Sequence, residues 1–224
     1  MPHPLAKRCL AELIGTFCLV FAGCGAVATD STLGGFGVVG IALAFGLIVL
    51  AMVYSLGHIS GAHINPAVTV AFLTKKMIPP KEAAAYMAAQ VIGAIAAAAL
   101  LRAMFYNFEL VNLGVTNPAQ GVTVGQAVGF EIIATFILVL VVLQVVTGPE
   151  SAGALAGVAI GGAVTVDVFL AGPICGASMN PARSIGPALI EMDLKHLWLY
   201  IVAPIGGALL AVLANNAMSA NEED

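Results

Sequence analysis

Six stretches of largely apolar residues, each long enough to cross a lipid bilayer, follow one another along the chain. A membrane-spanning α-helix needs about 20 such residues. Hydrophobic residues make up 60% of the chain and charged residues only 9%, a balance that soluble domains of this size do not have. The sequence therefore predicts an all-α membrane protein with six transmembrane helices. They are expected roughly at 10–29, 37–57, 83–105, 125–147, 152–171 and 197–214.

The two halves of the chain resemble each other at matching places, which indicates an internal duplication. We therefore expect a single domain over residues 1–224 that consists of two repeats, at about 5–106 and 124–217. Because each repeat holds three spans, the second must cross the membrane in the opposite direction to the first. Inverted repeats of this kind place function near the middle of the membrane, where the halves meet. The matching segments are AELIGTF (11–17) with FEIIATF (130–136), GIALAFG (40–46) with GVAIGGA (157–163), and YMAAQVIGA (86–94) with YIVAPIGGA (200–208).

Each repeat also contains an apolar segment that is too short to span the membrane. One follows Asn65 and the other follows Asn180, and each is about ten residues long. Asn is a strong helix N-cap, and Pro at the first helical position loses no hydrogen bond. We expect two re-entrant half-helices whose N-termini meet head to head near the bilayer centre. They begin with Asn65, Pro66, Ala67 and with Asn180, Pro181, Ala182.

A third Asn-Pro-Ala tripeptide begins at Asn117, in the polar connection between the repeats. No apolar run follows it, and the other repeat has no counterpart. We expect this copy to lie in a loop.

The positive charges favour one orientation in the membrane. Arg102 and Lys195 lie on one side of the predicted spans, and more Lys and Arg residues lie on the other. The positive-inside rule then places both termini in the cytoplasm, and we expect a plasma-membrane (inner-membrane) protein in the lipid bilayer. A net charge of −4 argues against a nucleic-acid partner. The residues on the more positive side are Lys7, Arg8, Lys75, Lys76 and Lys81.

The first span can also be interpreted as a secretory signal, because Lys7 and Arg8 precede an apolar run that ends at Ala26-Val27-Ala28. Glu12 fits poorly in the apolar region of a signal. The duplication also requires this segment in the mature chain, so we expect a transmembrane helix instead.

SGAHINPAV (60–68) and GASMNPARS (176–184), one in each half, resemble the two motifs of the aquaporin (major intrinsic protein) family. The resemblance covers nearly the whole chain. It implies a right-handed bundle of six helices and two half-helices, one pore in each subunit, and a homotetramer. Ser184 and Ala188 are similar to water channels rather than to glycerol facilitators, whereas Ile201 stands where many water channels have Trp.

Within that family, MVYSLGHISGAH (52–63) and AGPICGASMNPARSIGPA (171–188) are similar to the nodulin-like intrinsic proteins and to microbial aquaporins. The resemblance implies passage of water, glycerol and neutral metalloid hydroxides such as arsenous or boric acid. We do not expect a regulatory tail like those in the long termini of plant members.

Four positions form the outer constriction of the family, and counting from the two motifs assigns them here to Phe45, Val168, Ala177 and Arg183. Strict water channels commonly have His at the second position and often Cys or Thr at the third. Because Val168 and Ala177 are smaller or less polar, we expect a wider and more apolar opening. Phe45 replaces the Trp that is frequent in the nodulin-like group.

The motif residues also predict how ions are excluded. The amides of Asn65 and Asn180 can donate hydrogen bonds to a solute, and each helix N-terminus carries about half a positive charge. Arg183 lies one turn beyond Asn180, and an arginine at this depth is costly unless it faces water or a partner. We expect it to face the pore and repel cations, with a buried ion pair as the alternative.

Three acidic residues lie within the predicted spans. Glu12 and Glu131 occupy matching places in the repeats, and we expect both to accept hydrogen bonds from the loops before the half-helices, with a proton relay as the alternative. Asp167 has no counterpart and is expected to face protein or the outer vestibule, with a role in selectivity as the alternative. His58 and His63 are expected to form loop hydrogen bonds rather than to bind a metal.

The sequence thus predicts a passive channel for water and small uncharged solutes, including glycerol-sized polyols and neutral metalloid hydroxides, that excludes ions and protons. The alternatives are a strictly water-selective channel and an ion-coupled transporter. No catalytic residues, cofactor or metal site are predicted, because no nucleophile with a base and no ligand triad is visible.

Overall fold

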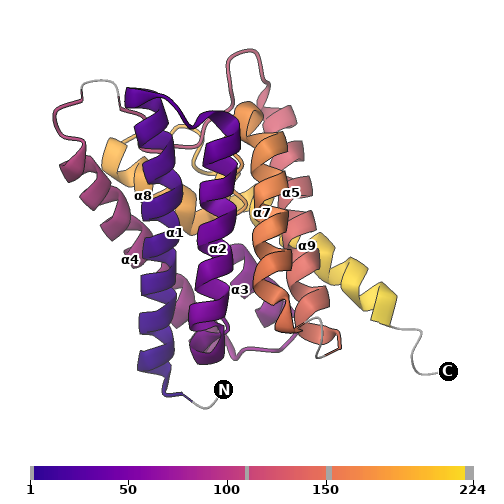
Figure 1. The fold of residues 1–224 in the computed structure, drawn as a ribbon. Helices are drawn as coiled ribbons and strands as arrows, with labels where there is room; N and C mark the ends of the chain where they lie inside the picture. Colours follow the sequence, from indigo (N-terminus) through magenta and orange to yellow (C-terminus); the bar gives the residue numbers. More distant parts are fainter. Residues whose placement is uncertain (1–2, 109–110, 150–152, 220–224) are drawn as a thin grey trace.

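The computed structural model describes residues 3–108, 111–149 and 153–219, and within these ranges it contains helices and no strands (Figure 1). Six helices are long and apolar enough to cross a membrane, which confirms the predicted fold class. The helices are α1 (Leu5–Leu33), α2 (Gly37–Ser60), α3 (Pro66–Thr74), α4 (Pro80–Met104), α5 (Val124–Thr147), α7 (Ala156–Cys175), α8 (Pro181–Glu191) and α9 (Leu199–Ser219).

Local sequence explains where several of these helices begin and end. α5 starts with a capping box in which Thr123 and Gln126 satisfy each other's backbone N–H groups. α2 is followed by Gly61 and α7 by Gly176, and both C-cap glycines adopt the left-handed conformation that glycine adopts without steric cost. In both halves this glycine therefore lies four residues before the Asn that opens the next half-helix.

The observed helices differ from the predicted apolar windows at several ends. α1 runs from Leu5 to Leu33, whereas the apolar window covers 10–29, because polar residues at helix ends can lie at the membrane surface. α7 begins at Ala156 rather than at 152, a position outside the described residues. Asn117 lies in a non-helical connection, as expected.

The two halves pack in the same way. α1 contacts α2 and α4, and correspondingly α5 contacts α7 and α9. α8 packs against α4 and α3 against α9, while α2 meets α7 and α3 meets α8 at the centre (Figure 1). The helices α1, α2, α3 and α4 of the first half thus correspond, in that order, to α5, α7, α8 and α9 of the second. Each contact has a counterpart under this correspondence, as expected for an inverted repeat.

Glycines allow the long helices to approach each other closely. A Cβ on Gly93 would lie 2.3 Å from the carbonyl oxygen of Leu13, and one on Gly207 would lie 2.3 Å from that of Ile132. These are the equivalent α4–α1 and α9–α5 contacts. Close backbone approach at small residues is the usual way in which membrane helices pack.

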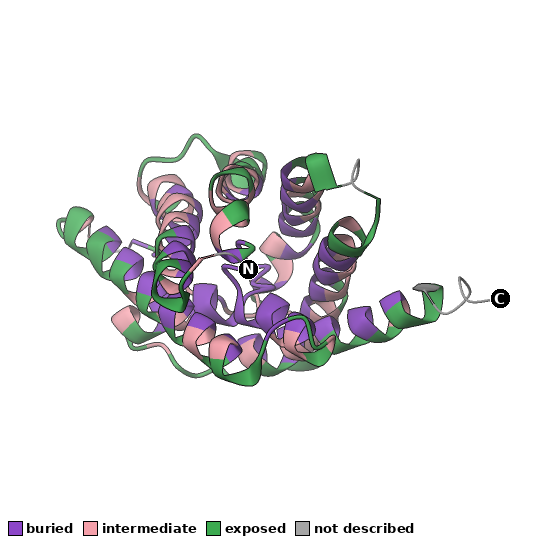
Figure 2. Cartoon of the chain, turned by 90° about the horizontal axis from the view of Figure 1, so that it is seen from below, coloured by how far each residue is buried: buried purple, intermediate pink, exposed green. Residues whose placement is uncertain are grey.

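The outer surface of the bundle is apolar. Exposed residues gather on the outward sides of the helices in Figure 2, which views the bundle from the end where the chain begins. Lipid chains are the natural neighbours of such a surface. Large apolar side chains exposed there include Leu10, Leu47, Ile92, Ile133, Val166 and Leu213.

Candidate functional site

Each half-helix begins at an asparagine whose side chain caps it. The Asn65 oxygen accepts the backbone N–H of Ala67 at 2.8 Å, and the Asn180 oxygen accepts that of Ala182 at 3.1 Å. Pro66 and Pro181 occupy the first helical positions, where a missing N–H has no cost. The Asn-Pro-Ala motifs therefore fold as their sequence predicts.

The two capping residues also join the halves of the molecule. Asn65 Nδ2 donates to the carbonyl of Met179 at 2.8 Å, and Asn180 Nδ2 donates to the carbonyl of Ile64 at 2.9 Å. The two helix N-termini thus meet head to head. An amide group has two N–H donors, so each asparagine keeps one for another acceptor, and both side chains line the same cavity.

The loops that lead into the half-helices hold an unusual backbone conformation. Ala62 and Ile64 have φ values of 46° and 42°, and the equivalent Ala177 and Met179 have 43° and 52°. Residues with a Cβ rarely adopt positive φ, and each such residue costs about 1–3 kcal/mol. Other interactions must therefore hold these loops in place.

Two fully buried carboxylates supply those interactions. Glu12 accepts the N–H groups of His63 (2.9 Å) and Ile64 (2.6 Å), one at each oxygen. Glu131 accepts the N–H groups of Ser178 (2.7 Å) and Met179 (2.9 Å) in the same manner. This geometry matches the loop support predicted for both residues, and its importance for permeation stays a prediction.

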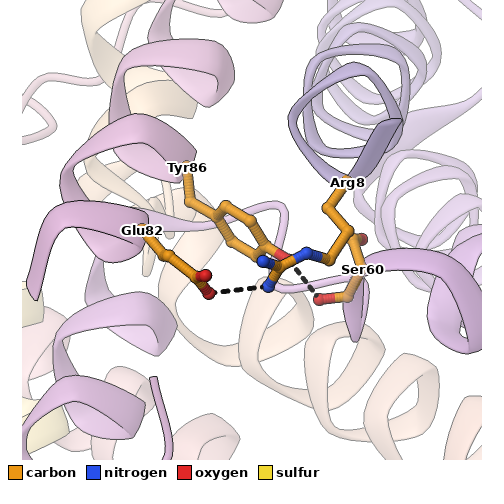
Figure 3. Close-up of polar contacts among 4 residues, drawn as sticks. All are labelled: Arg8, Ser60, Glu82 and Tyr86. Atoms are coloured by element: carbon orange, nitrogen blue, oxygen red, sulfur yellow. Dashed lines mark hydrogen bonds and ion pairs between the residues drawn. The ribbon is translucent and has the colours of Figure 1, made fainter. Parts of the chain in front are cut away.

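The first loop has further support that sequence reasoning missed. Gln90 and Ser60 both donate to Glu12, at 2.7 and 2.6 Å. Tyr86 donates its hydroxyl to the Ser60 carbonyl at 2.9 Å, and the Arg8 guanidinium lies over the Tyr86 ring, 5.8 Å from its centroid (Figure 3).

Arg8 in turn donates to Glu82 at 2.7 Å, so an ion pair between the starts of α1 and α4 is connected through Tyr86 to the loop. In the second half Tyr200 donates to the Cys175 carbonyl at 2.7 Å, which is equivalent to the Tyr86 contact. The matching tyrosines of the repeated segments were the signal that could have identified this contact.

Two cavities inside the bundle share part of their walls. The first, of about 670 Å³, runs from Tyr54 and Ala154 past both capping asparagines to Arg183. The second, of about 240 Å³, lies on the other side of Arg183 and is lined by the loop after α4. Both volumes are large enough for several small molecules, since one water occupies about 30 Å³ of liquid.

The four residues of the predicted constriction lie in the walls of these cavities. Among the described residues, Phe45 and Arg183 are the two that line both cavities, while Ala177 lines the first and Val168 the second. The Arg183 guanidinium lies 5.0 Å from the centroid of the Phe45 ring. The walls of the two cavities therefore include the side chains of the predicted constriction, whose width and selectivity stay predictions.

Arg183 is held without a counter-ion from the part of the chain that the structure describes. It is 3% exposed, and its Nη1 donates to the carbonyl of Gly114. No carboxylate of the described residues lies within 4.0 Å of it, which excludes a buried ion pair within that part of the chain. Its charge is therefore directed at the passage that it lines.

The remaining candidate residues do not line the passage at the constriction. Asp167 is 1% exposed and lines neither cavity, and its Oδ2 has no hydrogen-bond partner among the described residues. His63 Nδ1 lies 3.2 Å from the Thr69 hydroxyl, and His58 is exposed. Within the described residues, no group of three potential metal ligands comes together.

Comparison with known proteins agrees with this geometry. Residues 2–215 match the model of the major intrinsic protein family. The chain is 47% identical over 220 residues to Aquaporin NIP1-3 of Oryza sativa subsp. japonica, covering 96% of this chain and 76% of that one. It is 45% identical over 211 residues to Aquaporin NIP3-1 of Arabidopsis thaliana, covering 91% and 64%.

The fold is also that of a solved structure, the aquaglyceroporin from Plasmodium falciparum, with a TM-score of 0.85, 24% identity and coverage of 96% and 97% of the two chains. The likeness at this identity concerns the fold. Together with the family match over nearly the whole length, it confirms the resemblance read from the two motifs. The chain belongs to the major intrinsic protein family, whose members include the aquaporins.

Proposed function

We propose that the protein is a passive channel for water and small uncharged solutes, and not an enzyme. The observation that carries this proposal is that the two cavities share Phe45 and Arg183 in their walls, with the capping asparagines in the wall of the larger one. A solute in this passage meets N–H donors beside an otherwise apolar wall. Such a lining compensates for lost hydration without binding the solute tightly.

The fixed positive charge along the passage excludes cations. Two helix N-termini contribute roughly half a charge each near Asn65 and Asn180, and Arg183 contributes a full charge. A monovalent cation about 4 Å from Arg183 is repelled by about 4 kcal/mol at an effective dielectric constant near 20. That energy lowers the population of the ion by about a thousandfold and does not affect a neutral molecule.

The residues around the constriction favour more than water alone. Val168 and Ala177 are small and leave the opening wide, whereas the Phe45 ring and Arg183 narrow it. We propose that glycerol-sized polyols and neutral metalloid hydroxides pass together with water. A strictly water-selective channel is the second candidate, favoured by the close approach of Arg183 to Phe45.

An ion-coupled transporter is less well supported by the placement of the acids. Glu12 and Glu131 are occupied by backbone N–H groups of the loops, and neither lines a cavity. Asp167 does not line either cavity. A coupling carboxylate would have to be reached by the ion and the solute.

We further propose the arrangement in the membrane. Arg8 pairs with Glu82, and Lys75 donates to Asn216 at 2.6 Å, so the beginning of α1 and the end of α9 lie at one end of the bundle (Figure 1). The basic residues of that end favour the cytoplasmic side of a plasma membrane. The paired contacts of the halves support the division into repeats at 5–106 and 124–217 of one domain. A homotetramer is expected from the family and can be checked by light scattering in detergent.

Stopped-flow light scattering on proteoliposomes tests the function. Sucrose as the osmolyte should reveal fast water flux, and glycerol and arsenous acid should enter faster than into empty liposomes of the same lipid. Solute uptake equal to that of empty liposomes would leave only the water-selective candidate. A sustained proton current under a pH gradient would contradict the channel mechanism itself.

A further inference from the structure

The Phe45 ring, which lines both cavities, is supported from behind by a glycine. Gly23 lies in α1, and a Cβ built on it would be 2.1 Å from Cε1, 2.4 Å from Cδ1 and 2.5 Å from Cζ of Phe45. Ordinary contacts of a Cβ begin near 3.4 Å. One edge of the ring therefore occupies the space that any side chain at position 23 would fill.

The next residue of α1 supports the other side of the constriction. Cys24 is fully buried, and a Cβ on Gly114 would lie 2.8 Å from its Sγ and 2.9 Å from its Cβ. Gly114 has a φ of 79°, and its carbonyl accepts the hydrogen bond of Arg183. Gly23 thus lies against the Phe45 ring, and Cys24 lies against Gly114, which holds Arg183.

Neither α1 residue is part of the passage. Gly23 and Cys24 line neither cavity, whereas Phe45 lines both. An atom added at Gly23 can be accommodated only if the ring moves away from α1. The distance from the added Cβ to Cε1 of Phe45 must increase from 2.1 Å to an ordinary 3.4 Å, which is a shift of 1.3 Å.

We propose that Gly23 is a specificity-determining residue, which sets the width of the constriction by letting Phe45 lie back against α1. This inference rests on the constriction assigned under the proposed function. A shift of that size is close to the 1.4 Å radius of a water molecule. Because Phe45 lines both cavities, displacing its ring away from α1 narrows the opening that it shares with Arg183, and solutes larger than water are affected most.

The variant G23A tests the inference in proteoliposomes. Glycerol flux should fall roughly tenfold or more, as one added methyl group in a close-fitting site commonly does, and water flux should fall less. G162A is the matched control: it is the same change within a transmembrane helix, and a Cβ there meets nothing within 4 Å. It should keep the fluxes of the parent protein.

A second pair of variants separates steric pressure from misfolding. F45A removes all three ring atoms that the new Cβ would meet, so G23A/F45A should conduct like F45A alone and should fold even where G23A does not. Glycerol and water fluxes in G23A equal to those of the parent would overturn the inference. So would a G23A/F45A protein that is as impaired relative to F45A as G23A is relative to the parent.

The wide-pore function is tested separately. If the parent protein carries no glycerol, that function fails, and the comparison of G23A, F45A and the double variant is then made on water flux. Reduced water flux in G23A that is absent from the F45A background would still support the role of Gly23.

Discussion

Replacing Glu131 by Gln measures how strongly the second re-entrant loop depends on a buried carboxylate. The two carboxylate oxygens accept the backbone N–H groups of Ser178 at 2.7 Å and Met179 at 2.9 Å. A glutamine side chain has one acceptor oxygen and one NH2 donor group. In E131Q one of the two backbone N–H groups therefore faces another donor and loses its partner.

The expected cost follows from these contacts. A hydrogen bond to a charged acceptor contributes about 1.5–3 kcal/mol, and a buried donor without a partner costs about 1–3 kcal/mol. Because the two terms overlap, E131Q should lower the free energy of unfolding by about 2–5 kcal/mol. For a chain of this size the midpoint temperature should fall by roughly 4–20 °C.

The equivalent change at Glu12 should cost less. The Ser60 hydroxyl that donates to Glu12 can rotate and accept instead. Gln90 has a buried Oε1 with no partner among the described residues, and turning its amide group would present that oxygen to the new NH2 group. E12Q thus has two neighbouring groups that can re-pair, whereas the Cys175 thiol beside Glu131 is a weak partner.

Thermal unfolding in detergent, followed by the monodisperse fraction after heating, measures both variants, and stopped-flow water permeability shows whether the pore is preserved. E191Q is the control, because Glu191 lies 3.8 Å from a half-exposed Arg102 and contributes little. An E131Q protein that melts with the parent, or an E12Q protein that melts below E131Q, would refute the reasoning.

Three further changes have distinct outcomes. V168H should narrow the junction beside Phe45 and reduce glycerol flux more than water flux; unchanged glycerol flux would place Val168 outside the constriction. R183V removes a repulsion of about 4 kcal/mol for a cation 4 Å away and should permit an ion or proton current, measured with a pH-sensitive dye inside the vesicles; no current would assign the barrier to the helix N-termini alone. R8M leaves Glu82 unpaired and should lower the midpoint temperature in the thermal assay, which R8M/E82Q should partly restore; a double variant no more stable than R8M would contradict this.

Much of the fold can be predicted from the sequence because the membrane leaves few alternatives. Apolar windows predict the spans, since only helices and closed barrels satisfy their backbone in lipid. The repeated Asn-Pro-Ala predicts two short helices, because the cap and the first-turn proline act locally. The places of Glu12 and Glu131 follow from the duplication alone.

What the sequence could not provide depends on contacts between distant residues. Arg8 and Glu82 are 74 positions apart and have no counterpart pair in the other repeat, so neither periodicity nor symmetry points to them. Gly23 resembles the other small residues of its helix until the backbone of α1 is placed behind Phe45. Glycine carries no chemistry of its own, and the information lies in the neighbour that fills its space.

The reciprocal bonds between the two asparagines and the opposite loops have a consequence for the order of assembly. Asn65 reaches a carbonyl 114 residues later in the chain, and Asn180 reaches one 116 residues earlier. During synthesis the first half therefore enters the membrane with the Ile64 carbonyl and the Asn65 amide still lacking these partners. The pore centre can form only after the second half has been inserted. Two separately expressed halves should accordingly recover water flux when they are produced together, and neither should do so alone.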